Sequence, residues 1–135
     1  MIGKLNHVAI AVPSVKNSAK QYKELLGAKI SEELELPDQG VKTIFVELDN
    51  TKIEFIEPLG SNSPIKKYLD KKPLGGMHHI CYEVKDIEFA IKKLVQNGAI
   101  ILGNGKPSIG AHGKPVIFLH PKNFSGTLIE LEEVK

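Results

Sequence analysis

The sequence contains no arginine: all 18 of its basic residues are lysines, and 16 acidic residues leave a formal net charge of +2. Without a guanidinium group, no side chain can hold a carboxylate through two parallel hydrogen bonds. An anionic ligand must therefore be bound by lysines, backbone N–H groups or a metal ion. The lysines are scattered rather than gathered in a stripe, which argues against nucleic-acid binding.

Long apolar runs and disulfide pairs are also missing. No segment approaches the ~18 apolar residues that span a bilayer, and no signal-peptide pattern opens the chain, so we expect a cytoplasmic protein. The single cysteine, Cys81, excludes an internal disulfide. Because Cys81 lies in the apolar run Ile80-Cys81-Tyr82, a packed core or cavity-wall thiol is favoured over a catalytic thiol.

The chain reads as one structural unit written twice. Residues 5–12 and residues 77–84 are both strand-like, carry a histidine at the third position (His7 and His79) and end on valine. An amphipathic helix follows each of them. We predict a first helix from an N-cap at Ser14 to Gly27 and a second from Asp86 to Gly98.

Three short strands are predicted after each helix, and these six segments are Ala28–Leu36, Val41–Leu48, Thr51–Glu57, Ala99–Leu102, Pro115–Leu119 and Thr127–Glu133. We therefore predict an α+β fold of two tandem βαβββ modules, module one at about residues 3–58 and module two at about 76–134. Ser63 and Pro64 begin a linker helix at about 61–73.

The spacing of matching residues supports the duplication. The histidines are 72 residues apart and the glutamates Glu54 and Glu130 are 76 apart. The four additional residues fall in the glycine-rich loop 103–114, and loops tolerate such insertions.

Strand alternation places four polar side chains on the face away from the predicted helices. They are His7, Glu54, His79 and Glu130. Ala9 and Ala11 on the same face are small enough to leave a hollow. A single histidine or glutamate in a strand is usually structural, but two imidazoles and two carboxylates in repeated positions favour a divalent first-row metal site with open positions for water or substrate oxygens.

These residues resemble the vicinal-oxygen-chelate (glyoxalase-like) superfamily and, within it, the methylmalonyl-CoA epimerase family. The matching stretches are residues 5–13, 75–80 and 109–122, and the resemblance extends over nearly the whole chain. It implies a cleft formed by the two modules and places the family's metal ligands on the same four residues. One position departs from the pattern. Some members carry a glutamate base shortly after a Gln-Gly pair, but here Gln39-Gly40 is followed by Val41, Lys42 and Thr43.

The resemblance implies that the chain epimerises (2R)- and (2S)-methylmalonyl-CoA by removing the C2 proton and forming a metal-stabilised enolate. One divalent ion per chain is expected: cobalt, with nickel, manganese, zinc or iron as alternatives. Glu130 and Glu54 are the expected catalytic bases, and Glu47 is a third candidate. The expected acyl-CoA ligands are Lys106, Ser108, Lys114 and Lys122.

Two histidines are left with alternative roles. His112 and His120 either face the substrate or belong to turns, and the glycine and proline that follow them favour turns. Exposed strand edges in this architecture predict a homodimer.

Two other functions fit the same four ligand types. Glyoxalase I uses such ligands on a glutathione hemithioacetal, but arginines commonly hold the glutathione carboxylates in that branch. A metal-free binding protein of the same fold would not need an intact set of two histidines and two glutamates.

Overall fold

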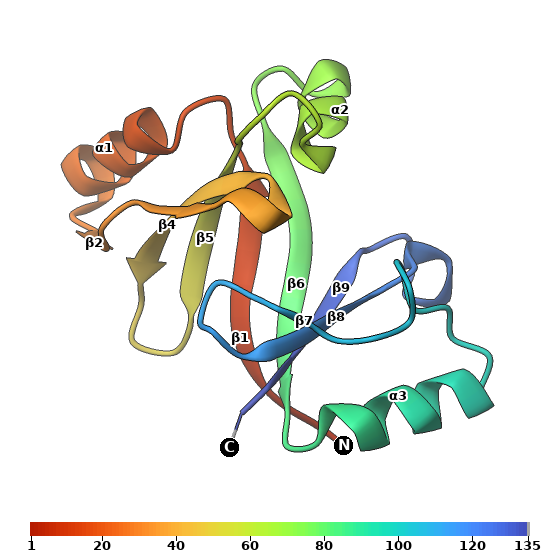
Figure 1. Cartoon of the computed structure of the whole chain (residues 1–135). Helices are drawn as coiled ribbons and strands as arrows, with labels where there is room; N and C mark the ends of the chain where they lie inside the picture. The colour runs from red at the N-terminus through yellow and green to blue at the C-terminus, as the bar shows by residue number, and fades with distance from the viewer. Residues whose placement is uncertain (135) are drawn as a thin grey trace. The chain divides into compact units, whose positions relative to one another are not determined.

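The computed structural model describes residues 1–134, and within this range it contains three α-helices and nine strands (Figure 1). In chain order the elements are β1 (Ile2–Ala11), α1 (Val15–Leu26), β2 (Lys29–Ile30), β3 (Leu34–Leu36), the 3₁₀ helix η1 (Pro37–Gln39), β4 (Val41–Glu47), β5 (Lys52–Pro58), α2 (Pro64–Lys71), β6 (Gly76–Val84), α3 (Ile87–Gln96), β7 (Ser108–Ile109), β8 (Pro115–Leu119), the 3₁₀ helix η2 (Pro121–Asn123) and β9 (Ile129–Glu133). None of the helices in the described range is long and apolar enough to cross a membrane.

The chain divides into two compact units. The N-unit contains His7–His78, and the C-unit contains Met1–Asn6 together with the chain from His79 onward. Strands β1 and β6 each contribute residues to both units. Each unit is described by itself below.

In the N-unit, β4 pairs antiparallel with β5, and β5 pairs parallel with β1. Helix α1 packs against β4 and β5 (Figure 1). Its amphipathic face supplies Val15 and Ala19 to an apolar core that also contains strand residues. The buried members of this core are Val12, Val15, Ala19, Ile44, Val46 and Phe55.

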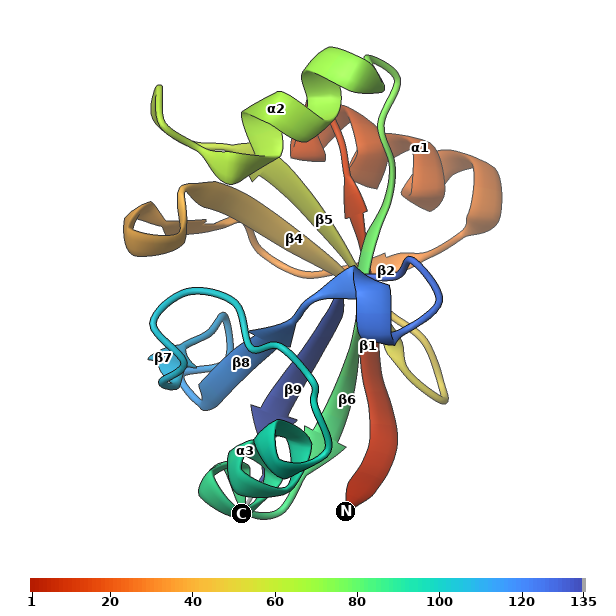
Figure 2. The same ribbon diagram turned by 90° about the vertical axis from the view of Figure 1, so that its right-hand side faces the viewer.

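The C-unit repeats this construction. Strand β8 pairs antiparallel with β9, and β9 pairs parallel with β6. Helix α3 packs against β8 and β9, at the bottom of the view in Figure 2. The buried members of its core are Val84, Ile87, Ala90, Ile117, Leu119, Ile129 and Leu131.

The predicted starts of all three helices are confirmed by their caps. The side chains of Ser14, Ser63 and Asp86 each accept a hydrogen bond from a backbone N–H in the first turn of their helix. Gly27 ends α1 in the left-handed conformation at φ 65°, which a residue without Cβ adopts at little cost. Helix α3 ends earlier than predicted, because Asn97 rather than Gly98 is its C-cap.

The second strand of each predicted module is wrong as a continuous strand. The segment 28–36 forms two short strands, β2 and β3, which pair with opposite ends of β4. The segment 99–102 forms only one bridge, between Ile101 and Leu119. The loop 103–114 instead contributes β7, which pairs with the start of β8. In both units, two separate short segments thus take the place of this strand. In the C-unit they are separated by a loop in which Gly103 and Gly105 adopt the left-handed conformation.

Ala9 and Ala11, which were expected to border a hollow, lie beside the linker helix. Both side chains are fully buried and pack in a cluster with Ile56 and with Ile65 of α2. The linker helix therefore covers this part of the face opposite α1, which an argument from strand alternation alone could not anticipate.

Candidate functional site

In the N-unit, His7 and Glu54 form a buried pair on neighbouring strands. His7 Nε2 lies 3.2 Å from Glu54 Oε1, and the residues are 2% and 5% exposed. In the parallel register of β1 and β5, the residue opposite Glu54 is Ala9, two positions beyond His7. Because the alanine methyl group is small, the glutamate side chain has room to reach diagonally to the imidazole.

Two residues of β4 complete this half-site. Thr43 is fully buried, and its Oγ1 donates a hydrogen bond of 2.8 Å to Glu54 Oε2. Phe45 lies directly opposite Glu54 in the register. Its ring packs edge to face against the imidazole of His7, with the ring centroids 5.9 Å apart. Both oxygens of Glu54 are therefore directed: one toward His7 and the other toward Thr43.

The C-unit contains the same pair at the corresponding positions. His79 Nε2 lies 3.2 Å from Glu130 Oε1, and both residues are 6% exposed. Phe118 is opposite Glu130 in the register and packs edge to face against His79 at 5.3 Å. Cys81 takes the position of Ala9: it is opposite Glu130 and fully buried. Cys81 is therefore a buried thiol beside Glu130.

Each pair is chemically suited to binding a transition metal. It combines one imidazole nitrogen with one carboxylate oxygen, and both are donor atoms that first-row divalent ions accept. Two donor atoms that bind one ion at about 2.1 Å lie about 3.0 Å apart at a right angle and about 3.4 Å apart at the tetrahedral angle. The nitrogen–oxygen distance of 3.2 Å in each unit fits between these limits.

The residues predicted to bind an acyl-CoA lie on the surface of the C-unit. Lys106, Ser108, Lys114 and Lys122 are all exposed. The alternative base in the N-unit, Glu47, is also exposed and lies at the end of β4, opposite Lys29 and Lys52 in the strand registers.

His112 and His120, for which two roles were expected, make different contacts in the structure. His120 caps η2, since its Nδ1 accepts a hydrogen bond of 3.0 Å from the backbone N–H of Lys122. This hydrogen bond places His120 in a turn, one of its two expected roles. His112, in contrast, contacts the carboxylate of Glu132 at 2.9 Å.

Sequence reasoning missed Glu132 and Asn6. Glu132 is 3% exposed and Asn6 is 6% exposed, and Asn6 Nδ2 donates to Glu132 Oε2 at 3.2 Å and to Glu83 Oε2 at 2.9 Å. The signal for Glu132 was present, because a residue two positions beyond Glu130 lies on the same face of its strand.

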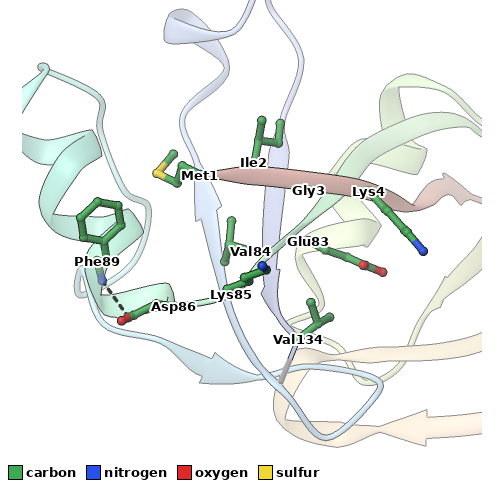
Figure 3. A pocket seen from close by; sticks show the side chains of 10 residues that line it. All are labelled: Met1, Ile2, Gly3, Lys4, Glu83, Val84, Lys85, Asp86, Phe89 and Val134. Carbon is green, nitrogen blue, oxygen red and sulfur yellow. Dashed lines mark hydrogen bonds between the residues drawn. The ribbon is translucent and has the colours of Figure 1, made fainter.

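A separate pocket of about 540 Å³ opens on the C-unit (Figure 3). Its lining combines apolar side chains with a few charged ones: Met1, Ile2, Gly3, Lys4, Glu83, Val84, Lys85, Asp86, Phe89 and Val134. Among the described residues that line it there is no predicted ligand or base, so it is distinct from the His–Glu pair of its unit.

Comparison with known proteins agrees with this construction. Residues 6–118 match the model of the glyoxalase/bleomycin resistance protein/dioxygenase superfamily. The chain is 58% identical over 134 residues to a Cereibacter sphaeroides protein named ethylmalonyl-CoA/methylmalonyl-CoA epimerase, covering 99% of this chain and 100% of that one. It is 52% identical over 132 residues to the human mitochondrial methylmalonyl-CoA epimerase, covering 98% of this chain and 74% of that one.

A solved structure shows the same fold. The methylmalonyl-CoA epimerase of Mycobacterium tuberculosis superposes with a TM-score of 0.91 at 28% identity, over 99% of this chain and 89% of that one. The predicted α+β fold of two tandem βαβββ modules is confirmed by this similarity and by the superfamily match.

Proposed function

This chain belongs to the methylmalonyl-CoA epimerase family of the glyoxalase/bleomycin resistance protein/dioxygenase superfamily, and from that premise we propose that it interconverts (2R)- and (2S)-methylmalonyl-CoA with the help of a divalent metal ion. The observation that carries the proposal is the buried His–Glu pair, which each unit builds from the same strand positions. The 58% identity to a protein named for this reaction supports the substrate.

The proposed ligands are His7 and Glu54 from the N-unit with His79 and Glu130 from the C-unit. Their nitrogen and oxygen donors, and the 3.2 Å separation within each pair, fit one ion of the cobalt, nickel, manganese, iron or zinc type, with cobalt the expected one. When bound, such an ion would stabilise the negative charge on the carboxylate oxygens of the substrate and the charge that develops on its thioester oxygen. This also explains how an arginine-free chain could hold a substrate carboxylate.

Epimerisation at C2 requires two proton carriers, one on each face of the planar intermediate. In one direction, the ionised carboxylate of Glu130 accepts the C2 proton, and the C–H electron pair passes into the thioester carbonyl to form an enolate. A protonated Glu54 then donates a proton to the opposite face of C2. The protonation states are exchanged after one turnover, and the reverse direction uses the same groups in opposite roles.

Coenzyme A carries phosphate groups, and the C-unit offers lysines for them. We assign Lys106, Ser108 and Lys114 of the loop 103–114, and Lys122 of η2, to the acyl-CoA, because all four are exposed and three are cationic. The cytoplasmic location and the homodimer stay predictions, and light scattering on the purified protein tests the second of them.

The direct test of this function follows hydrogen at C2. Chelated protein reconstituted with one metal ion is incubated in deuterated water with each stereoisomer of methylmalonyl-CoA, and the glutathione hemithioacetal of methylglyoxal is tested in parallel. We expect metal-dependent deuterium uptake at C2 and conversion of each stereoisomer to the other. Lactoylglutathione formation without C2 exchange would contradict the proposal in favour of a glyoxalase. Binding of the thioester without exchange would contradict it in favour of a metabolite-binding protein.

A further inference from the structure

Glu132 is a buried carboxylate with a role that the proposed chemistry leaves unassigned. It lies on β9, two residues beyond Glu130, and is only 3% exposed. Its two oxygens accept hydrogen bonds from different segments of the C-unit: Oε2 from Asn6 Nδ2 at 3.2 Å and Oε1 from His112 Nδ1 at 2.9 Å. A buried carboxylate requires such donors, since burial without them costs several kcal/mol.

The contact with Glu132 determines the orientation of the His112 ring. A carboxylate oxygen accepts in this contact when Nδ1 of His112 carries the hydrogen. The neutral ring is then the Nδ1–H tautomer, which differs from the tautomer that isolated histidine mostly adopts. His112 is 26% exposed, so a substitution there is not a deep core change.

His112 belongs to a tight turn that lies against Glu130. The turn is closed by hydrogen bonds from Gly110 N to the Lys114 carbonyl, 2.9 Å, and from Gly113 N to the Gly110 carbonyl, 3.0 Å. A Cβ added at Gly110 would lie 2.8 Å from Val116 Cγ1 and 3.7 Å from Glu130 Oε2. The backbone of the turn is therefore close to one oxygen of the proposed base, and the other oxygen faces His79.

We propose that Glu132 is a positioning residue: by holding His112, it fixes the turn 110–113 against Glu130 and so determines where the Glu130 carboxylate is presented to C2. The inference rests on the proposed function in assigning the base to Glu130. The tether itself consists of Asn6, Glu132 and His112, whose contacts join β1, β9 and the turn. A base that moves by even about 1 Å loses a large part of its effect.

Four substitutions in the metal-loaded protein test the tether. Glu132→Gln leaves only one acceptor oxygen for two donors, and His112→Ala removes the donor in the turn. His112→Asn is the conservative variant, because its amide nitrogen lies the same two bonds beyond Cβ as Nδ1 does. Glu83→Gln is the matched control, because Glu83 accepts from the same Asn6 side chain, whereas His112 contacts Glu132.

The expected loss in Glu132→Gln and His112→Ala is roughly 10- to 100-fold, mainly in kcat, because alignment of the base matters in the transition state. His112→Asn should recover most of this loss, and Glu83→Gln should stay within about twofold of the wild type. Amide hydrogen exchange of residues 110–113 should become faster in the first two variants, while amides of β8 and β9 keep their protection.

Unchanged exchange of the turn together with an unchanged kcat in Glu132→Gln would overturn the inference. So would a His112→Asn variant as impaired as His112→Ala, because the ring would then act on the substrate rather than as a tether. The exchange measurement does not depend on the reaction. Faster turn exchange in a protein that fails to epimerise would leave the tether standing and remove the proposed function instead.

Discussion

The two units build the same His–Glu pair but surround its carboxylate differently. In both, the histidine packs against a phenylalanine and its Nε2 lies 3.2 Å from the glutamate. In the N-unit, the threonine of β4 donates a hydrogen bond to Glu54. In the C-unit, the corresponding position of β8 is Val116, which has no donor, and the turn at Gly110 lies beside Glu130 instead.

This difference indicates how one duplicated frame can produce two roles. The repeated histidine and glutamate supply the two donor atoms that metal ligation requires, and the repeated phenylalanine packs against the histidine ring. The features that differ are the ones that set the position of each carboxylate. We infer that Thr43 sets the position of the Glu54 carboxylate, whereas the Glu130 carboxylate is positioned by a turn that itself depends on Glu132.

The largest expected effect is shared by both units. His7→Ala and His79→Ala each remove one imidazole ligand, so metal affinity should fall by more than the roughly 10- to 100-fold typical of outer-sphere partners. Calorimetric titration of chelated protein with cobalt measures this. Wild-type affinity in either variant would remove that histidine from the proposed ligand set.

Replacing each carboxylate by an amide tests its role as a proton carrier in its own unit. Glu130→Gln keeps a carbonyl oxygen that can ligate, but an amide cannot accept a proton at neutral pH. We expect weakened but retained metal binding and a kcat lower by roughly 10²-fold or more, the scale of a lost general base. Glu54→Gln is the internal comparison at saturating metal: as the second proton carrier it should lose kcat to a similar degree, and a clearly smaller loss would leave Glu54 as a metal ligand only.

Giving the N-unit the valine that the C-unit has at the corresponding position should have an intermediate effect on kcat. Thr43→Val removes the hydrogen bond to Glu54 and should lower kcat by about 3- to 10-fold, which corresponds to the roughly 1 kcal/mol of one hydrogen bond. Thr43→Ser should restore most of the activity. A Thr43→Val protein with wild-type kinetics and metal affinity would show that this hydrogen bond has no functional weight.

The smallest effect is expected where the C-unit has Cys81 and the N-unit has Ala9. Cys81→Ala makes the C-unit match the N-unit at the position opposite its glutamate. We expect a kcat within about twofold of the wild type and a loss of about 1 kcal/mol in the free energy of unfolding, because only one buried sulfur is removed. A loss of activity larger than tenfold would instead return the thiol to the catalytic candidates.

Much of this comparison could be predicted from the sequence. Strand alternation places His7 and Glu54 on one face, and His79 and Glu130 on the equivalent one, because side chains in strands repeat every two residues. The helix starts were equally readable, since Ser14, Ser63 and Asp86 are the residue types that cap helices.

The network of Asn6, Glu132 and His112 could not be predicted in the same way. Asn6 and His7 are both buried, so the alternation of β1 breaks between them. His112 lies in a glycine-rich loop, where no periodic pattern relates a residue to a distant strand. The covering of Ala9 and Ala11 by α2 was missed for a related reason, because a linker helix has an apolar face but its sequence does not state where that face packs.

The central claim is that the carboxylates of the two units act on opposite faces of C2, and one measurement tests it most directly. Deuterium uptake from solvent is followed separately for the (2R) and (2S) stereoisomers with metal-saturated Glu130→Gln and Glu54→Gln. The account predicts that each variant loses exchange more severely from one stereoisomer, and that the two variants affect opposite ones. Wild-type exchange of both stereoisomers by Glu130→Gln would contradict it and leave Glu130 as a metal ligand only.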